Sequence, residues 1–150
     1  MKTALITFFM SMVPVIELRG AIPYGIANGL SVPLTFVLAV IGNLIPIPFL
    51  VVFTRKVFEW LRTKSKGLDR FVSKLEAKAD KKKDVVLRSE FIGLTILVAI
   101  PLPGTGAWTG ALVAAMLDMR LRRAMPSIIL GVIIAGIIVM AITCGAVAAL

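Results

Sequence analysis

The chain opens with two short apolar stretches separated by a charged segment. Residues 5–16 are apolar but would form a helix only about 18 Å long, whereas a bilayer core of about 30 Å needs about 20 residues. Residues 17–25 then carry two charges, two glycines and a proline, and apolar residues dominate again over 21–30. Because both arms are too short to cross, the pattern predicts a re-entrant helical hairpin over residues 5–30 with its turn in 17–25.

A longer apolar stretch follows. Residues 33–53 are apolar for 21 residues, which is long enough to span a bilayer. Pro33 stands at the start, where a helix tolerates proline, while Pro46 and Pro48 lie inside and predict a kink or an interruption. Asn43 precedes them. Its favoured interpretation is a hydrogen bond between helices in lipid, and the alternative is a contact to a substrate.

The second half of the chain repeats this plan. Residues 91–100 form a short apolar arm, residues 101–110 form a turn rich in proline and glycine, and residues 111–117 form another short arm. Residues 125–150 are then apolar for 26 residues and rich in small side chains, which allow helices to pack closely in lipid. The pattern predicts a second re-entrant hairpin over 91–117 and a second transmembrane helix over 125–150.

The segment between the halves, residues 55–90, is polar and basic. It holds 12 of the 17 lysines and arginines and six of the eight acidic residues. Apolar residues recur in it at helical spacing, which predicts an amphipathic helix lying along the membrane surface, with Trp60 as an interface anchor. This stripe consists of Leu68, Phe71, Val72, Leu75 and Ala79. The positive-inside rule places residues 55–90 and the basic residues 118–123 in the cytoplasm.

These assignments give an orientation to the whole chain. If each hairpin returns to the face it left, the first enters from outside, the second enters from the cytoplasm, and both termini lie outside. The expected fold is an all-α integral membrane protein with a single domain over 1–150 and two inverted repeats, 1–54 and 91–150. Each repeat is a re-entrant helical hairpin plus a transmembrane helix, and a cytoplasmic amphipathic helix joins them. Four complete spans are the alternative.

Composition supports a membrane protein. Hydrophobic residues make up 59% of the chain and the mean hydropathy is +0.98, which is too apolar to bury in a globule of this size. No small-residue cleavage site follows the first apolar stretch, so we expect it to be retained rather than removed as a signal peptide. The net charge of +9 gathers beside the membrane without stacking aromatics or an RNA motif, so nucleic acid is not an expected partner.

The residue inventory narrows the chemistry. The chain has no histidine and one cysteine, Cys144, which excludes histidine-based metal sites and an intrachain disulfide. No nucleophile–base set or metal cluster is visible. We therefore expect no enzyme activity, no cofactor and no metal.

Glu17 and Arg19 are the strong charges within the apolar part of the first half. Charges at membrane depth are costly unless paired or hydrated, so they indicate function by default. Glu17 could carry a proton or balance a cation, and Arg19 could hold a phosphate or carboxylate; a purely structural ion pair is the alternative. Each turn also precedes a helix N-terminus, which favours anions. The candidate substrate- or ion-binding residues are Glu17, Arg19, Gly20, Pro23, Tyr24, Asn43, Pro101, Pro103, Gly104, Thr105, Gly106 and Trp108.

Two motifs carry a resemblance to a known family. They read Glu17-Leu-Arg19-Gly20-Ala-Ile-Pro23-Tyr-Gly25 and Pro101-Leu-Pro103-Gly104-Thr105-Gly106-Ala-Trp108. The chain resembles, over nearly its whole length, the small multidrug export protein family, which is distantly similar to the DedA/VTT membrane proteins. The resemblance implies paired re-entrant hairpins in a bacterial or archaeal cell membrane. DedA proteins usually carry an arginine in the second turn, where this chain has Thr105 and Trp108.

The expected function is therefore a small membrane transporter, a multidrug or small-molecule exporter coupled to protons or ions, with its site at the midplane between the two turns. One alternative is a DedA-type flippase for a lipid or lipid-carrier phosphate. Another is a non-transporting assembly or scaffold protein that works through residues 55–90. The expected partners are membrane lipids, a small-molecule or lipid-phosphate substrate and a second copy of the chain in a homodimer.

Overall fold

The computed structural model describes residues 1–64, 67, 83–102 and 105–149, and every regular element in these residues is a helix. The first half contains α1 (Lys2–Met12), α2 (Glu17–Ala27), α3 (Val32–Leu44) and α4 (Pro46–Lys64). The second half contains α6 (Lys83–Ala99), α7 (Ala107–Met116) and α8 (Leu121–Ala149). The prediction of an all-helical chain is confirmed for these residues. The amphipathic helix predicted over residues 68–79 lies outside them.

Two apolar helices are long enough to cross a bilayer. Among the described residues, these are 32–57, which joins α3 to the start of α4, and 121–149, which is α8. The interruption predicted at Pro46 and Pro48 is present, because α3 ends at Leu44 and α4 starts at Pro46. Neither proline carries an N–H, so the carbonyls of Gly42 and Leu44 lack their usual helical donors there.

The first hairpin differs from its prediction in the position of the turn. The chain reverses at residues 13–16, and Glu17 is already the first residue of α2. Gly20, Pro23 and Gly25 are therefore helical, although the sequence placed them in a turn. Pro14 explains the earlier reversal, because proline ends a helix more readily than the isolated glycines that follow. Pro23 is tolerated inside α2 at the cost of one helical hydrogen bond.

The other boundaries shift in the same direction. α6 reaches back to Lys83, into the segment assigned to the connector, and α7 starts at Ala107 instead of residue 111. α8 starts at Leu121, so part of the basic patch 118–123 lies in its first turn. Hydrophobicity located each apolar core, but helices continue into polar residues as long as the backbone allows.

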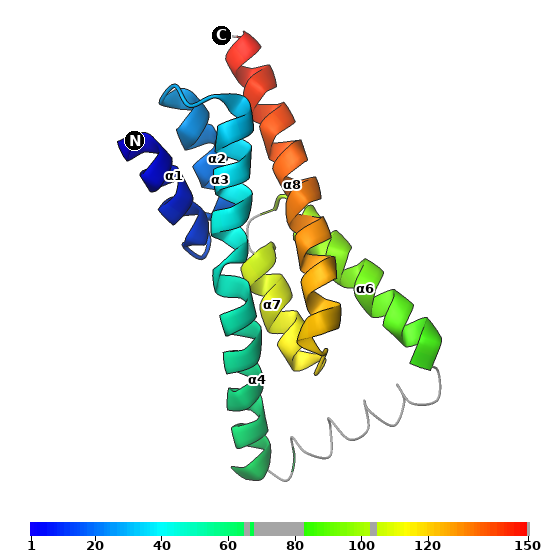
Figure 1. Cartoon of the computed structure of the whole chain (residues 1–150). Coiled ribbons are helices and arrows are strands. Elements are labelled where there is room, and N and C mark those ends of the chain that lie inside the picture. Colours follow the sequence, from blue (N-terminus) through cyan, green and yellow to red (C-terminus); the bar gives the residue numbers. More distant parts are fainter. Residues whose placement is uncertain (65–66, 68–82, 103–104, 150) are drawn as a thin grey trace.

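The two halves use the same packing scheme (Figure 1). α1 packs on α2 and α3, while α6 packs on α7 and α8. The second arm of each hairpin also packs on the long helix of the other half: α2 on α8, and α7 on α4. As Figure 1 shows, the turn between α1 and α2 and the turn between α6 and α7 both lie near the middle of the long helices. The re-entrant and inverted character of this arrangement stays a prediction.

Small residues allow the close approach of these helices. A Cβ on Gly42 would lie 2.5 Å from the carbonyl oxygen of Phe8, and one on Gly110 would lie 2.5 Å from Val98. The hydroxyl of Ser11 donates to the carbonyl of Ala39 across the α1–α3 contact. Many large apolar side chains remain on the surface, including Phe49 and Phe53. Such a surface suits lipid and is unfavourable in water.

Gly131 of α8 provides a test of this packing. A Cβ there would lie 2.6 Å from the Cβ of Val98 and 2.9 Å from the carbonyl oxygen of Thr95. Gly131→Val should therefore lower the free energy of unfolding by about 1–3 kcal/mol through overpacking. Gly145→Val is the matched control on the same helix, because a Cβ there meets nothing within 4 Å. Thermal unfolding in detergent would measure both, and equal effects would contradict the packing assignment.

Candidate functional site

Glu17 is held at the junction of α1 and α2 by an unusual backbone. Both Val15, with φ 76°, and Glu17, with φ 48°, lie in the left-handed region, which costs energy for residues with a Cβ. The N–H of Glu17 donates to the carbonyl of Val13 at 3.0 Å, which closes the turn. Glu17 is only 3% exposed. The turn therefore directs a carboxylate into the protein interior, away from the lipid-facing surface.

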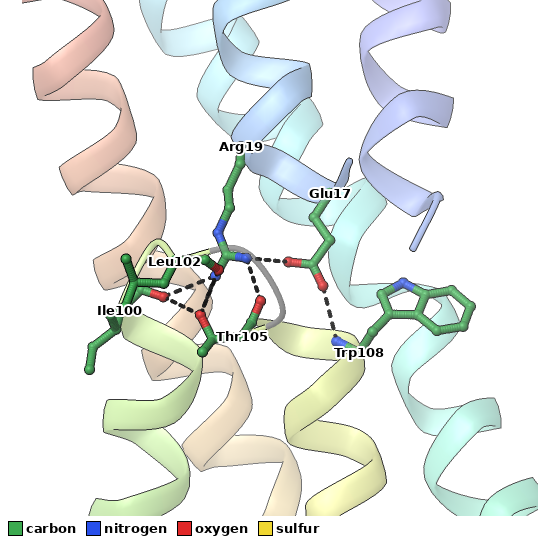
Figure 2. A network of polar contacts seen from close by, with 6 residues as sticks. All are labelled: Glu17, Arg19, Ile100, Leu102, Thr105 and Trp108. Carbon is green, nitrogen blue, oxygen red and sulfur yellow. Dashed lines mark hydrogen bonds and ion pairs between the residues drawn. The ribbon is translucent and has the colours of Figure 1, made fainter. Parts of the chain in front are cut away.

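The carboxylate of Glu17 lies at the N-terminus of α7 (Figure 2). Its Oε1 accepts a hydrogen bond from the backbone N–H of Trp108 at 3.2 Å. Trp108 is the second residue of α7, and its N–H is one of those that a helix start leaves without an internal partner. Glu17 thus plays the part of an N-capping side chain supplied from the other half of the chain.

Gly106 makes this approach possible. It precedes α7 with φ 133°, and a Cβ at this position would lie 2.2 Å from Oε2 of Glu17. Only glycine combines that backbone conformation with the necessary space. Gly106, a candidate substrate- or ion-binding residue in the sequence, therefore lies against the protein's own carboxylate.

Arg19 holds the other side of the same turn. Its Nη2 donates to the carbonyl of Ile100 at 3.0 Å and to the hydroxyl of Thr105 at 3.1 Å, and its Nη1 donates to the carbonyl of Thr105. Ile100 directly follows α6, where carbonyls without helical partners carry partial negative charge. The guanidinium of Arg19 therefore lies at the end of α6, while the carboxylate of Glu17 lies at the start of α7.

An ion pair and a threonine complete the arrangement. Nη1 of Arg19 lies 3.8 Å from Oε2 of Glu17. The hydroxyl of Thr105 lies 2.7 Å from the carbonyl oxygen of Ile100 and 2.8 Å from that of Leu102, and it donates its one hydrogen to either. We call Glu17, Arg19, Ile100, Leu102, Thr105 and Trp108 the turn network; Figure 2 shows all six.

Three buried polar groups have no hydrogen-bond partner among the described residues. They are Nε of Arg19, the side-chain amide of Asn43 and the indole nitrogen of Trp108. Asn43 is fully buried, so the favoured interpretation of an interhelical hydrogen bond does not describe its side chain. An unpaired buried polar group costs energy, so these groups are available to a ligand or to water.

Trp108 also borders an open apolar groove of about 920 Å³. The groove runs along α4, with Met12 of α1 and Leu121 of α8 on its sides. Trp108 therefore joins the turn network to the groove, because its backbone belongs to the network and its ring lines the groove.

The structure brings together part of the predicted site. Glu17, Arg19, Thr105, Gly106 and Trp108 meet, and Pro101 lies in the same turn between α6 and α7. Gly20 packs against Ile16, where a Cβ would lie 2.5 Å from the isoleucine side chain. Pro23 and Tyr24 lie further along α2, outside the turn network. Pro103 and Gly104 fall outside the described residues.

Sequence reasoning missed two backbone acceptors of the turn network, the carbonyl of Ile100, which accepts from Arg19, and that of Leu102, which accepts from Thr105. The carbonyls of Ile100 and Leu102 belong to apolar residues, whose side chains give no sign of a polar role. The available signal was positional, since residues just after a helix expose unpaired carbonyls. Among the described residues there is no group of three or more histidine, cysteine or acidic side chains that could hold a metal ion.

Comparison with known proteins identifies one family. The family model described as "Putative small multi-drug export protein" matches residues 17–138 of this chain. The match starts at Glu17, the first residue of α2, and covers the turn between α6 and α7. No curated protein and no solved structure matches the chain.

Gly106 offers a direct test of the geometry. Gly106→Ala should lower the free energy of unfolding by about 2–4 kcal/mol, because it combines an unfavourable backbone conformation with a clash against Glu17. Gly93→Ala in α6 is the control, since a Cβ there meets nothing within 4 Å and alanine favours a helix. Thermal unfolding in detergent would compare them. If Gly106→Ala were as stable as Gly93→Ala, the contact between the two turns would be wrong.

Proposed function

Because the chain belongs to the small multi-drug export protein family, we propose that this membrane protein exports small molecules and that the turn network couples its two halves. The observation that carries the proposal is the buried Glu17 carboxylate, which joins α2 to α7 across the middle of the molecule. Charges at such positions in membrane proteins serve ion or substrate movement by default.

We place both hairpins inside the bilayer as inverted re-entrant repeats. α1 and α2 have 11 residues each and α7 has 10, so each reaches only about 15–17 Å, roughly half of a 30 Å bilayer core. The matching packing of the two halves supports the repeat. In this arrangement the helix ends would face each other at the midplane, as in transporters with broken helices.

Glu17 is the proposed coupling group. Protonation would remove the attraction between Glu17 and Arg19 and the favourable interaction of a negative charge with the start of α7. The contact between α2 and the α6–α7 turn would weaken, which would let the halves change their relative position. A network with a charged, closed form and a neutral, looser form is the kind of two-state element that alternating access requires.

The substrate would interact with the groups that the turn network leaves unpaired. The indole N–H of Trp108 is a donor, and the amide of Asn43 is both donor and acceptor. The apolar groove beside Trp108 would hold the hydrophobic part of the substrate. This combination favours an uncharged or weakly polar lipophilic molecule. A homodimer and a distant relation to DedA proteins stay predictions.

Phosphate binding is less well supported. Both terminal nitrogens of Arg19 already donate to protein oxygens, so the fork that would grip a phosphate is occupied. The start of α7 is likewise occupied by the carboxylate of Glu17. A flippase for a lipid phosphate would have to displace both, so we favour the exporter. The scaffold alternative concerns residues 55–90, most of which lie outside the described residues.

Glu17→Gln tests the coupling role. Glutamine keeps the size and an acceptor for the N–H of Trp108 but cannot be ionised, so transport driven by a pH gradient should fall at least about tenfold while the fold persists. Transport of Nile red, an uncharged lipophilic dye, in proteoliposomes with an imposed pH gradient would measure it. Glu59→Gln is the control, since the Glu59 side chain is 61% exposed. Undiminished pH-driven transport by Glu17→Gln would refute the coupling role.

Cysteine labelling tests the topology. In a Cys144→Ser background, single cysteines at Lys2, Asn28 and Ala148 should react with an impermeant maleimide from one side of the membrane. Cysteines at Ser89 and Arg120 should react from the other side, because each re-entrant hairpin returns to its own face. Labelling of Lys2→Cys and Asn28→Cys from opposite sides would mean that the first hairpin crosses completely.

A further inference from the structure

The two ends of the apolar groove along α4 differ in the residues that line them. Its inner end, near the middle of the molecule, is formed by Met12, Ile45 and Trp108, and its walls include the highly exposed Phe49 and Phe53. Its outer end is formed by Lys56 of α4 and Leu121 at the start of α8. Lys56 is the charged side chain among the described residues that line it.

The outer end carries free positive charge. Arg120 and Arg122 flank Leu121 and are exposed, as is Lys56. The neighbouring Arg55 is different, because it pairs with Asp118 at 2.8 Å and with Glu59 at 3.6 Å. The ion pairs among the described residues do not involve Lys56, Arg120 or Arg122. Within the described residues, the groove therefore joins a long apolar surface to a cationic rim without acidic partners.

The dimensions of the groove match one leaflet of a bilayer. Lys56 and Ile45 lie about 16 Å apart along the helix at about 1.5 Å per residue, and half of a hydrocarbon core is about 15 Å. We propose that the groove binds an acyl chain of an anionic phospholipid from the leaflet at the connector end, with the headgroup phosphate beside Lys56, Arg120 and Arg122. The end of the chain then contacts the ring of Trp108.

A second copy of this chain is a poorer occupant. In a twofold dimer with its axis along the membrane normal, equivalent residues of the two copies lie at the same depth. The cationic rims would then face each other without acidic partners, which is unfavourable. A lipid supplies both the apolar chain and the opposite charge. The inference does not depend on transport, and a substrate that entered the groove would displace the acyl chain.

Fluorescence quenching tests the proposal. The chain has two tryptophans, so full-length Trp60→Phe protein reports Trp108 alone. It is reconstituted in vesicles of unbrominated phosphatidylcholine. A minor fraction of the lipid is brominated deep in the acyl chain and is either phosphatidylglycerol or phosphatidylcholine. Brominated phosphatidylglycerol should quench Trp108 with about fivefold higher apparent affinity, which is the enrichment expected for about one effective cation.

Two variants in the same background decide the outcome. Lys56→Gln should reduce the preference for phosphatidylglycerol to less than half, whereas Lys2→Gln, which changes a lysine at the start of α1, should leave it unchanged. Equal quenching by both lipids, or an equal response to the two variants, would overturn the proposal, since the groove would then have no headgroup site. Absence of quenching by either lipid would also overturn it and would indicate that protein covers the groove.

Discussion

The structure depends on how the helix ends near the middle of the molecule are satisfied. α6 ends and α7 begins in the middle of the molecule, so unpaired carbonyls and N–H groups lie far from either end of the long helices. In an apolar medium each such group is costly. Arg19 supplies donors to the carbonyls after α6, and Glu17 supplies an acceptor to the start of α7. One pair of residues from α2 thus completes two helix ends of the other half.

The conformations around the network follow from that requirement. Glu17 adopts a positive φ, Val15 does so two residues earlier, and Gly106 takes a conformation suited to glycine. None of these is favourable by itself. They persist because they bring a carboxylate and a helix start to 3.2 Å from each other. The opposite charges of Glu17 and Arg19 also suit the opposite partial charges of the two helix ends, so either residue alone would leave one end unmatched.

The sequence predicted the elements better than the turns. Segment lengths identified α1, α2, α7 and the long helices, because hydrophobicity reports the apolar length of a helix directly, whereas α6 has 17 residues and extends into the predicted connector. The first turn was placed at residues 17–25, and the chain turns at 13–16. Gly20, Pro23 and Gly25 predict a break in the helix, but packing against α1, α3 and α8 keeps α2 helical. For the site, Glu17 and Arg19 were found because buried charge is rare. The carbonyls of Ile100 and Leu102 could not be found from the sequence, since they are backbone atoms of ordinary apolar residues.

The occupancy of the network bears on what it can do. Both terminal nitrogens of Arg19 donate to protein oxygens. The carboxylate of Glu17 accepts from the N–H of Trp108 and pairs with Arg19. A substrate that bound directly to these charges would first have to break those contacts, whereas a proton needs only to reach one carboxylate oxygen. The groups without partners, the indole of Trp108 and the amide of Asn43, are neutral. In the proposed function, the charged pair would sense protons and control the contact between the halves, while the indole of Trp108 and the amide of Asn43 would recognise the substrate. Trp108 is the residue through which the two could communicate, because its main chain binds Glu17 and its ring borders the groove.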